Sequence, residues 1–103
     1  MKVSDYIAQF LAGIGIDTAF VLTGGCAVHM IDSIAKRKDI GYVAVQHEQA
    51  GAMAAEAYAR IKGIGVAVVT SGPGATNMIT SIANCFYESI PCIFLSGQIL
   101  EKL

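Results

Sequence analysis

The sequence predicts an α/β protein, in which an open parallel sheet of about four strands carries helices on both faces. Two observations support this prediction. Strand-like and helix-like segments alternate along the 103 residues, and the strand-like segments are continuous apolar runs. Such runs are typical of strands buried on both faces, because the right-handed crossovers of a parallel sheet cover each side with helices. The length is that of one domain, so residues 1–103 are expected to form a single unit.

The first half of the chain contains two predicted helices and two predicted strands. The first helix covers about residues 4–14, with Ser4 or Asp5 as its N-cap. Its apolar side chains have the spacing of one helical face, which is expected to consist of Ile7, Phe10, Leu11 and Ile14. The next elements in chain order are a strand at 18–22, a helix at 27–37 and a strand at 41–46.

The second half begins with an alanine-rich helix at residues 48–62. Small residues recur on every side of it, so we expect this helix to be packed nearly all round, with Glu56 and Arg60 as an i,i+4 pair. The clearest strand of the chain follows at 65–70. The remaining elements are expected to be one helix at about 75–88 and a strand at 91–95.

Charge and cysteine content exclude several classes of protein. Seven Lys and Arg against eight Asp and Glu give a net charge of -1, which leaves no basic face for a nucleic acid. The three cysteines, Cys26, Cys85 and Cys92, form no C-x-x-C pair and no disulfide framework. The first residues also lack the apolar core of a signal peptide, so a cytoplasmic protein is expected.

Residues 63–87 carry no charge, and their length alone would permit a membrane span. The centre of this stretch, residues 70–77, is polar and turn-forming, and in lipid it would leave backbone groups unpaired. We therefore expect protein interior and no membrane contact. So large an uncharged segment also suggests a surface that a partner covers.

Three loops follow the first three predicted strands, at residues 23–26, 46–49 and 70–77. Ligands of open α/β sheets bind outside the carboxyl ends of the strands, so these loops are expected to share one rim. Glu48 stands out because it is an acid at the end of a strand, where burial would perturb its protonation. Its position also suits a first-turn glutamate that favours the helix dipole, and spacing alone leaves both interpretations open.

Other motifs near these loops carry weaker signals. His47 and Glu48 lack the second histidine of a zinc helix, because position 51 is Gly, and no metal site is predicted. Cys26 is expected to be a small buried thiol rather than a nucleophile. His29 faces either the site or the sheet. Residues 72–74, Gly-Pro-Gly, lack the third glycine of a dinucleotide fingerprint, and their glycines instead allow the backbone to approach something flat.

Two longer motifs identify a family. Residues 45–60, VQHEQAGAMAAEAYAR, and residues 69–77, VTSGPGATN, resemble the amino-terminal pyrimidine-binding domain of thiamine-diphosphate enzymes, nearest the acetolactate synthase group. The resemblance extends from the first helix to Gln98. It implies a flavodoxin-like strand order.

The resemblance also implies a cofactor site. Glu48 matches the glutamate that hydrogen-bonds N1′ of the aminopyrimidine, a contact that promotes the imino tautomer and so the ylid that adds to a 2-oxo acid or aldehyde. The family positions lining the pyrimidine site correspond here to Gly24, Gly25, Pro73, Gly74 and Asn77. Members of the family hold the diphosphate and Mg²⁺ through a Gly-Asp-Gly motif on another domain. This chain has no such motif, so Mg²⁺ is expected only through a domain absent from it.

The sequence also departs from the family pattern. Thr23 stands where the first loop commonly has Pro, which is closer to relatives of unsettled substrate that occur with carbohydrate biosynthesis. The family's domain continues beyond Gln98 with further strands, so this chain is expected to be an incomplete domain. We expect the pyrimidine-binding part of a lyase or transferase acting on 2-oxo acids, which needs a separate diphosphate-binding domain.

Other interpretations of the sequence remain. One is a non-catalytic α/β fragment or interaction module that binds no cofactor alone, and a further one is a flavodoxin-like nucleotide binder. Self-association is expected as well, because the alanine-rich helix lacks an ordinary solvent face and the strand at 91–95 lies near an uncompleted sheet edge.

Overall fold

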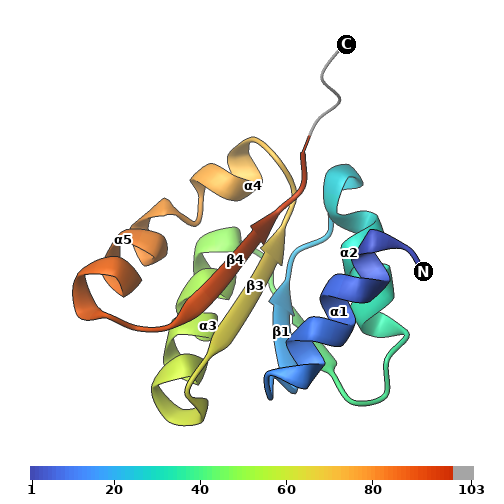
Figure 1. Cartoon of the computed structure of the whole chain (residues 1–103). Helices are drawn as coiled ribbons and strands as arrows, with labels where there is room; N and C mark the ends of the chain where they lie inside the picture. Colours follow the sequence, from blue (N-terminus) through green and yellow to red (C-terminus); the bar gives the residue numbers. More distant parts are fainter. Residues whose placement is uncertain (99–103) are drawn as a thin grey trace.

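Four parallel strands form the sheet of the computed structural model, which describes residues 1–98 (Figure 1). The strands lie in the order β2-β1-β3-β4, which confirms the predicted fold class and the flavodoxin-like order. Their bounds are β1 (Thr18–Val21), β2 (Gly41–Ala44), β3 (Gly65–Val69) and β4 (Cys92–Ser96). The strands β2 and β4 are therefore the two edges of this sheet.

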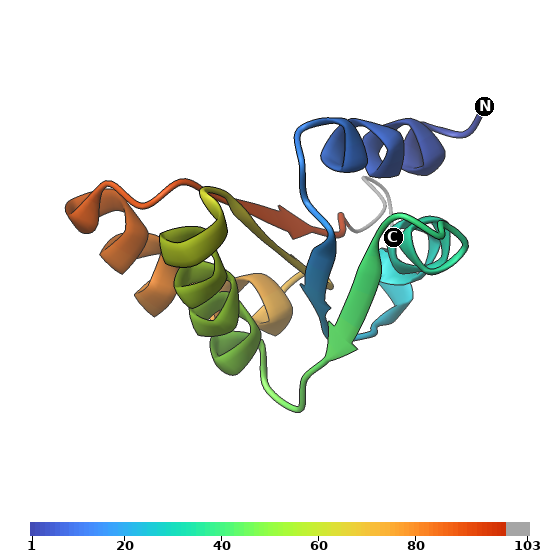
Figure 2. The ribbon, with the colours of Figure 1, turned by 90° about the horizontal axis from the view of Figure 1, so that it is seen from below.

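The helices cover both faces of the sheet (Figure 2). One face carries α1 (Val3–Gly13) and α2 (Val28–Ala35), and a short 3₁₀ turn at Gly25–Ala27 leads into α2. The other face carries α3 (Glu48–Lys62), α4 (Pro73–Thr76) and α5 (Ile79–Glu88). Among residues 1–98, none of these helices combines the length and apolarity that crossing a membrane requires.

The strand β3 lies at the centre and is buried along its whole length. Because successive side chains point to opposite faces, Val66 and Val68 join the core under α1 and α2, while Ala67 and Val69 join the core under α3. The small residues of α3 allow this helix to lie close to the strand. A Cβ added at Gly65 would come within 2.1 Å of a backbone oxygen of α3.

The expected single helix at 75–88 is wrong, because two helices, α4 and α5, occupy this region. Between them the Met78 N–H donates to the carbonyl of Ala75 at 3.0 Å, an i to i-3 bond that tightens the chain out of the α-helix. Tertiary contacts hold the break in place. The Met78 side chain is buried in the core under α3, and the Asn77 side chain bonds across to the N-terminus of α3.

The first helix differs from prediction at both its cap and its core face. Ser4 and Asp5 do not cap α1, because they lie inside its first turn, where Asp5 accepts a hydrogen bond from the Ser33 hydroxyl of α2 and the Ser4 hydroxyl lies 2.8 Å from the same oxygen. Of the four apolar side chains expected to form one face, Phe10 and Ile14 are exposed. The buried side chains of this helix are Ala8 and Leu11.

The alanine-rich helix α3 is not packed nearly all round within this chain, contrary to prediction. Its inner side is buried through Gly51, Ala52, Ala55 and Ala59. Its outer side exposes Met53 and Ile61. The expected pair of Glu56 and Arg60 is present at 4.0 Å, the long end of an ion pair.

Candidate functional site

Glu48 is the first residue of α3, at the carboxyl edge of the sheet. The helix starts here because the preceding His47 caps it, with the imidazole Nδ1 accepting from the Gln49 N–H at 3.1 Å. From the other side Asn77, just after α4, donates from Nδ2 to Oε1 of Glu48 at 3.0 Å. This bond joins the loop after β2 to the segment after β3, across the end of the intervening strand β1.

The hydrogen bond from Asn77 lowers the pKa of the Glu48 carboxyl below its usual range. Partial burial acts in the opposite direction and is the weaker effect, because the side chain is only half-buried. Burial was expected to perturb this group, and it does act on the pKa, but the hydrogen bond from Asn77 is the larger cause and sets the direction. The carboxylate is therefore ionised at neutral pH and is held in one orientation by a donor.

Thr70 connects the first and third loops. Its Oγ1 accepts from the Cys26 N–H at 3.3 Å, and its Cβ would lie only 2.5 Å from a Cβ added at Gly24. Gly24 is therefore glycine because the two loops touch at that point. Together with the bond between Glu48 and Asn77, this contact confirms that the three loops share one rim.

Gly74 brings backbone close to the carboxylate. It is buried, and a Cβ at this position would lie 3.7 Å from Oε2 of Glu48 and 2.9 Å from Cγ2 of Thr70. The turn that leads to it needs Gly72, whose φ of 64° lies in the left-handed region that side chains disfavour. Glycine at position 74 therefore lets the start of α4 pack closely against Thr70 beside the Glu48 carboxylate.

The structure thus brings some of the predicted residues together. Glu48, Gly74 and Asn77 form one cluster, and Gly24 reaches it through Thr70. Pro73 begins α4 and is exposed on the rim, and Gly25 is exposed with no heavy atom within 4 Å of an added Cβ. The role of Thr70 was not predicted from the sequence, although a threonine between a buried strand and a glycine turn was a usable signal.

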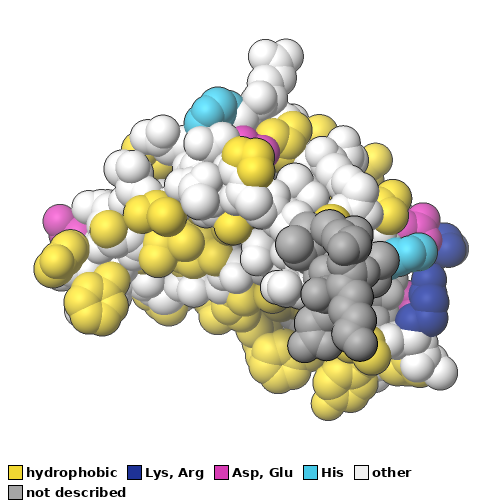
Figure 3. All heavy atoms as spheres, turned by 90° about the horizontal axis from the view of Figure 1, so that it is seen from above, with side chains coloured by type: hydrophobic (Ala, Val, Ile, Leu, Met, Phe, Trp, Pro, Cys, Tyr) yellow, Lys and Arg dark blue, Asp and Glu magenta, His cyan; other side chains and the backbone are white. Residues whose placement is uncertain are grey.

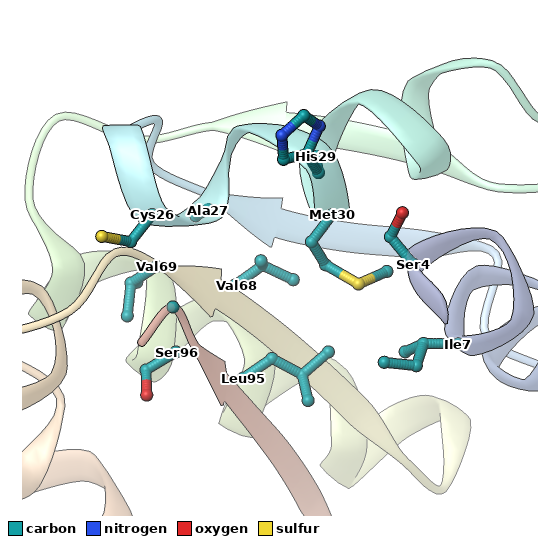
Figure 4. Close-up of a pocket in the computed structure, with 11 residues that line it drawn as sticks. Ser4, Ile7, Cys26, Ala27, His29, Met30, Val68, Val69, Leu95 and Ser96 are labelled. Atoms are coloured by element: carbon teal, nitrogen blue, oxygen red, sulfur yellow. The ribbon is translucent and has the colours of Figure 1, made fainter. Parts of the chain in front are cut away.

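Cys26 lies in the 3₁₀ turn before α2, and His29 lies in the first turn of α2. Cys26 is exposed, so the expected buried thiol is wrong: only its backbone is held, by Thr70. A cavity of about 240 Å³ lies beside it, between α1, α2 and the ends of β3 and β4. Figure 4 shows Ile7 and Leu95 pointing toward each other across this cavity, whereas the exposed His29 is directed away from them.

Metal-ligating side chains do not gather in the described part of the chain. Among residues 1–98, no group of three or more His, Cys, Asp or Glu is arranged to hold a metal ion. The main chemical feature of the rim is therefore the Glu48 carboxylate, oriented by Asn77.

An open parallel sheet with a carboxylate at its carboxyl edge is the architecture of α/β domains that bind ligands at that edge. The chain belongs to the thiamine pyrophosphate enzyme family, whose N-terminal TPP binding domain matches residues 1–102. It is 34% identical over 103 residues to the chloroplastic acetolactate synthase of Arabidopsis thaliana. It is also 40% identical over 101 residues to the acetolactate synthase large subunit of Buchnera aphidicola, and 38% identical over 97 residues to that of Lactococcus lactis.

These alignments cover 99%, 97% and 93% of this chain. They cover only 15%, 18% and 17% of the respective relatives. The chain thus spans less than a fifth of the length of these relatives.

Proposed function

We propose that this chain is the pyrimidine-binding part of a thiamine-diphosphate-dependent lyase or transferase that acts on 2-oxo acids. The observation that supports this proposal best is the Glu48 carboxylate, ionised and oriented by Asn77 at the carboxyl edge of the sheet, next to Gly74. A flat heterocycle with a ring nitrogen fits such a position. The similarity to acetolactate synthases supports the choice of cofactor and of 2-oxo acids as the substrate class.

The proposed roles follow from the contacts. Asn77 fixes Oε1 of Glu48, which leaves Oε2 to exchange a proton with N1′ of the aminopyrimidine. Gly74 admits the ring because a side chain there would begin next to Oε2. Pro73 offers a rigid, exposed surface at the start of α4. When bound, the cofactor supplies the carbon nucleophile that adds to the substrate carbonyl, while the protein supplies position and electrostatics.

The diphosphate and Mg²⁺ are proposed to bind to a separate domain, because the sequence contains no Gly-Asp-Gly motif. The outer face of α3 with the end of α5 is the surface proposed to meet that domain or a second copy. It exposes Met53 and Ile61 on α3, and Phe86 with Tyr87 on α5. The cytoplasmic location stays a prediction, since some similar relatives are chloroplastic.

This exposed apolar face also favours a second candidate function, an interaction module that binds no cofactor. Monomeric proteins rarely leave so many large apolar side chains in water without a partner. The two functions differ in one observable, which is whether partner binding creates a thiamine-diphosphate site.

Calorimetry separates these functions. Thiamine diphosphate with Mg²⁺ is titrated into the chain, into a separately expressed diphosphate-binding domain, and into their mixture. The proposed function predicts tight binding only in the mixture, weakened in Glu48→Gln and retained in Glu56→Gln, the same change two turns further along α3. Association of the two proteins without cofactor binding would support the interaction module instead.

A further inference from the structure

The outer face of α1 carries an apolar stripe that nothing in the chain covers. Val3 is 77% exposed, Tyr6 63%, Phe10 53% and Ile14 38%. The spacing of three and four residues places these side chains on one side of the helix. Figure 2 shows this helix as the outermost element of its layer, and Figure 3 shows hydrophobic side chains gathered along that side of the molecule as well as at the end formed by α5.

A hollow interrupts the stripe at Gly13. It has a volume of about 340 Å³ and is lined by Tyr6, Gln9, Phe10, Gly13 and Ile14. Nothing lies within 4 Å of the position that a Cβ of Gly13 would take. The one acidic residue of α1, Asp5, is bonded to Ser33 on the inner flank, so no acidic group of α1 needs to be desolvated when the stripe is covered.

Val3, Tyr6, Phe10 and Gly13 follow the alternating three- and four-residue spacing of a helix–helix seam. Suppose that two such helices lie antiparallel, with residue 8 of one helix at the same level as residue 8 of the other. Residue 6 of each helix then faces residue 10 of the other. Position 3 then faces position 13. In this register Tyr6 of one helix contacts Phe10 of the other, and Val3 lies opposite the hollow at Gly13.

We propose that this stripe is the surface on which α1 of a second copy of the chain packs antiparallel. Val3 of each copy enters the hollow at Gly13 of the other, and Tyr6 of each contacts Phe10 of the other. A second copy is the occupant because the stripe is complementary to itself in this register, which is the condition for a two-fold interface. This contact is separate from the α3 and α5 face proposed for the partner domain.

The area is sufficient for a weak dimer. Covered aromatic side chains bury about 150–250 Å² each, so at their exposures the four apolar residues offer on the order of 400–500 Å² per copy. Two copies would bury about 800–1,000 Å² of apolar surface, to which Gln9 beside the stripe adds polar area. The total reaches the approximately 1,000 Å² that a specific interface needs.

Disulfide cross-linking of the whole chain tests this register. Tyr6→Cys and Phe10→Cys are made separately in a Cys26→Ser background, which removes the exposed native thiol. The proposal predicts a covalent dimer when the two proteins are mixed and oxidised, and little product from either protein alone. A dimer from Tyr6→Cys alone would indicate parallel helices, and the absence of product from the mixture would also overturn the proposal.

Two further variants control for folding and for random collision. Gly13→Leu fills the hollow on a side where nothing else is displaced, so the variant should fold normally and lower the yield of the mixed dimer at least fivefold. An unchanged yield would overturn the placement of Val3. Phe86→Cys presents an even more exposed aromatic position on α5, and mixed with Tyr6→Cys it should give no more product than chance encounters do.

Discussion

Replacing Gly24 by alanine tests how the rim is assembled. The new Cβ would lie 2.5 Å from Cβ and 2.8 Å from Cγ2 of Thr70. Carbon atoms rest at about 3.5–4.0 Å, so one of the two loops must move by about 1 Å. Overpacking of this kind costs about 1–3 kcal/mol, and the movement also weakens the hydrogen bond from Cys26 to Thr70, worth about 0.5–1.5 kcal/mol.

The expected loss in the free energy of unfolding is therefore about 2–4 kcal/mol. In a domain of this size each kcal/mol lowers Tm by about 4–8 °C, so Gly24→Ala should lower Tm by about 10–30 °C. Circular dichroism during thermal unfolding, repeated with urea, measures this change.

The neighbouring Gly25→Ala is the matched control, because an added Cβ there meets no heavy atom within 4 Å. The backbone of Gly24 is extended, at φ -169°, a conformation that alanine also adopts. The difference between the two variants therefore reports the contact with Thr70 and not backbone strain. The double variant with Thr70→Gly should recover part of the loss, with a coupling of about 1 kcal/mol or more. If the two alanine variants unfolded within about 0.5 kcal/mol of each other, the contact between the loops would not exist as described.

Three further predictions concern the isolated chain. Calorimetry should give a Kd for thiamine diphosphate weaker than about 1 μM, and tighter binding would contradict the need for a second domain. Light scattering should show at least a dimer, because the outer face of α3 and the edge strand β4 lie open, and a monomer at high micromolar concentration would contradict this. A disulfide reagent should react quickly with Cys26 but not with the buried Cys85, since desolvation raises the pKa of the Cys85 thiol to about 12. Replacing Cys26 by Ser should remove the fast phase, and a fast phase that persisted would refute the assignment.

The sequence predicted the order and type of most elements because burial dominates them. The run from Gly65 to Val69 is apolar at every position, and the structure buries all of it. Prediction was poorer for α1, which is apolar on both sides. Periodicity located its apolar positions, but it could not tell that Leu11 faces the core while Phe10 faces solvent.

The parts of the site that sequence could not predict depend on contacts between distant residues. The helix break at Asn77 exists because its amide reaches Glu48, 29 residues away, and because Met78 is buried under α3. Thr70 acquires its role only by meeting Cys26, 44 residues away. Secondary-structure propensity depends on neighbouring residues only, so it cannot predict either of these long-range contacts. Glu48 itself was predictable because its place after a strand and before a helix is local.

Glu48 is proposed to exchange a proton with the aminopyrimidine of the cofactor. Exchange of the C2 proton of thiamine diphosphate with deuterium, followed by NMR in the assembly of this chain with its diphosphate-binding domain, measures the consequence directly. Glu48→Gln should slow this exchange by at least about 100-fold, because an amide cannot take up or release the proton. Glu56→Gln, on the same helix away from the rim, should leave the exchange unchanged. Exchange at the native rate in Glu48→Gln would contradict the role assigned to Glu48.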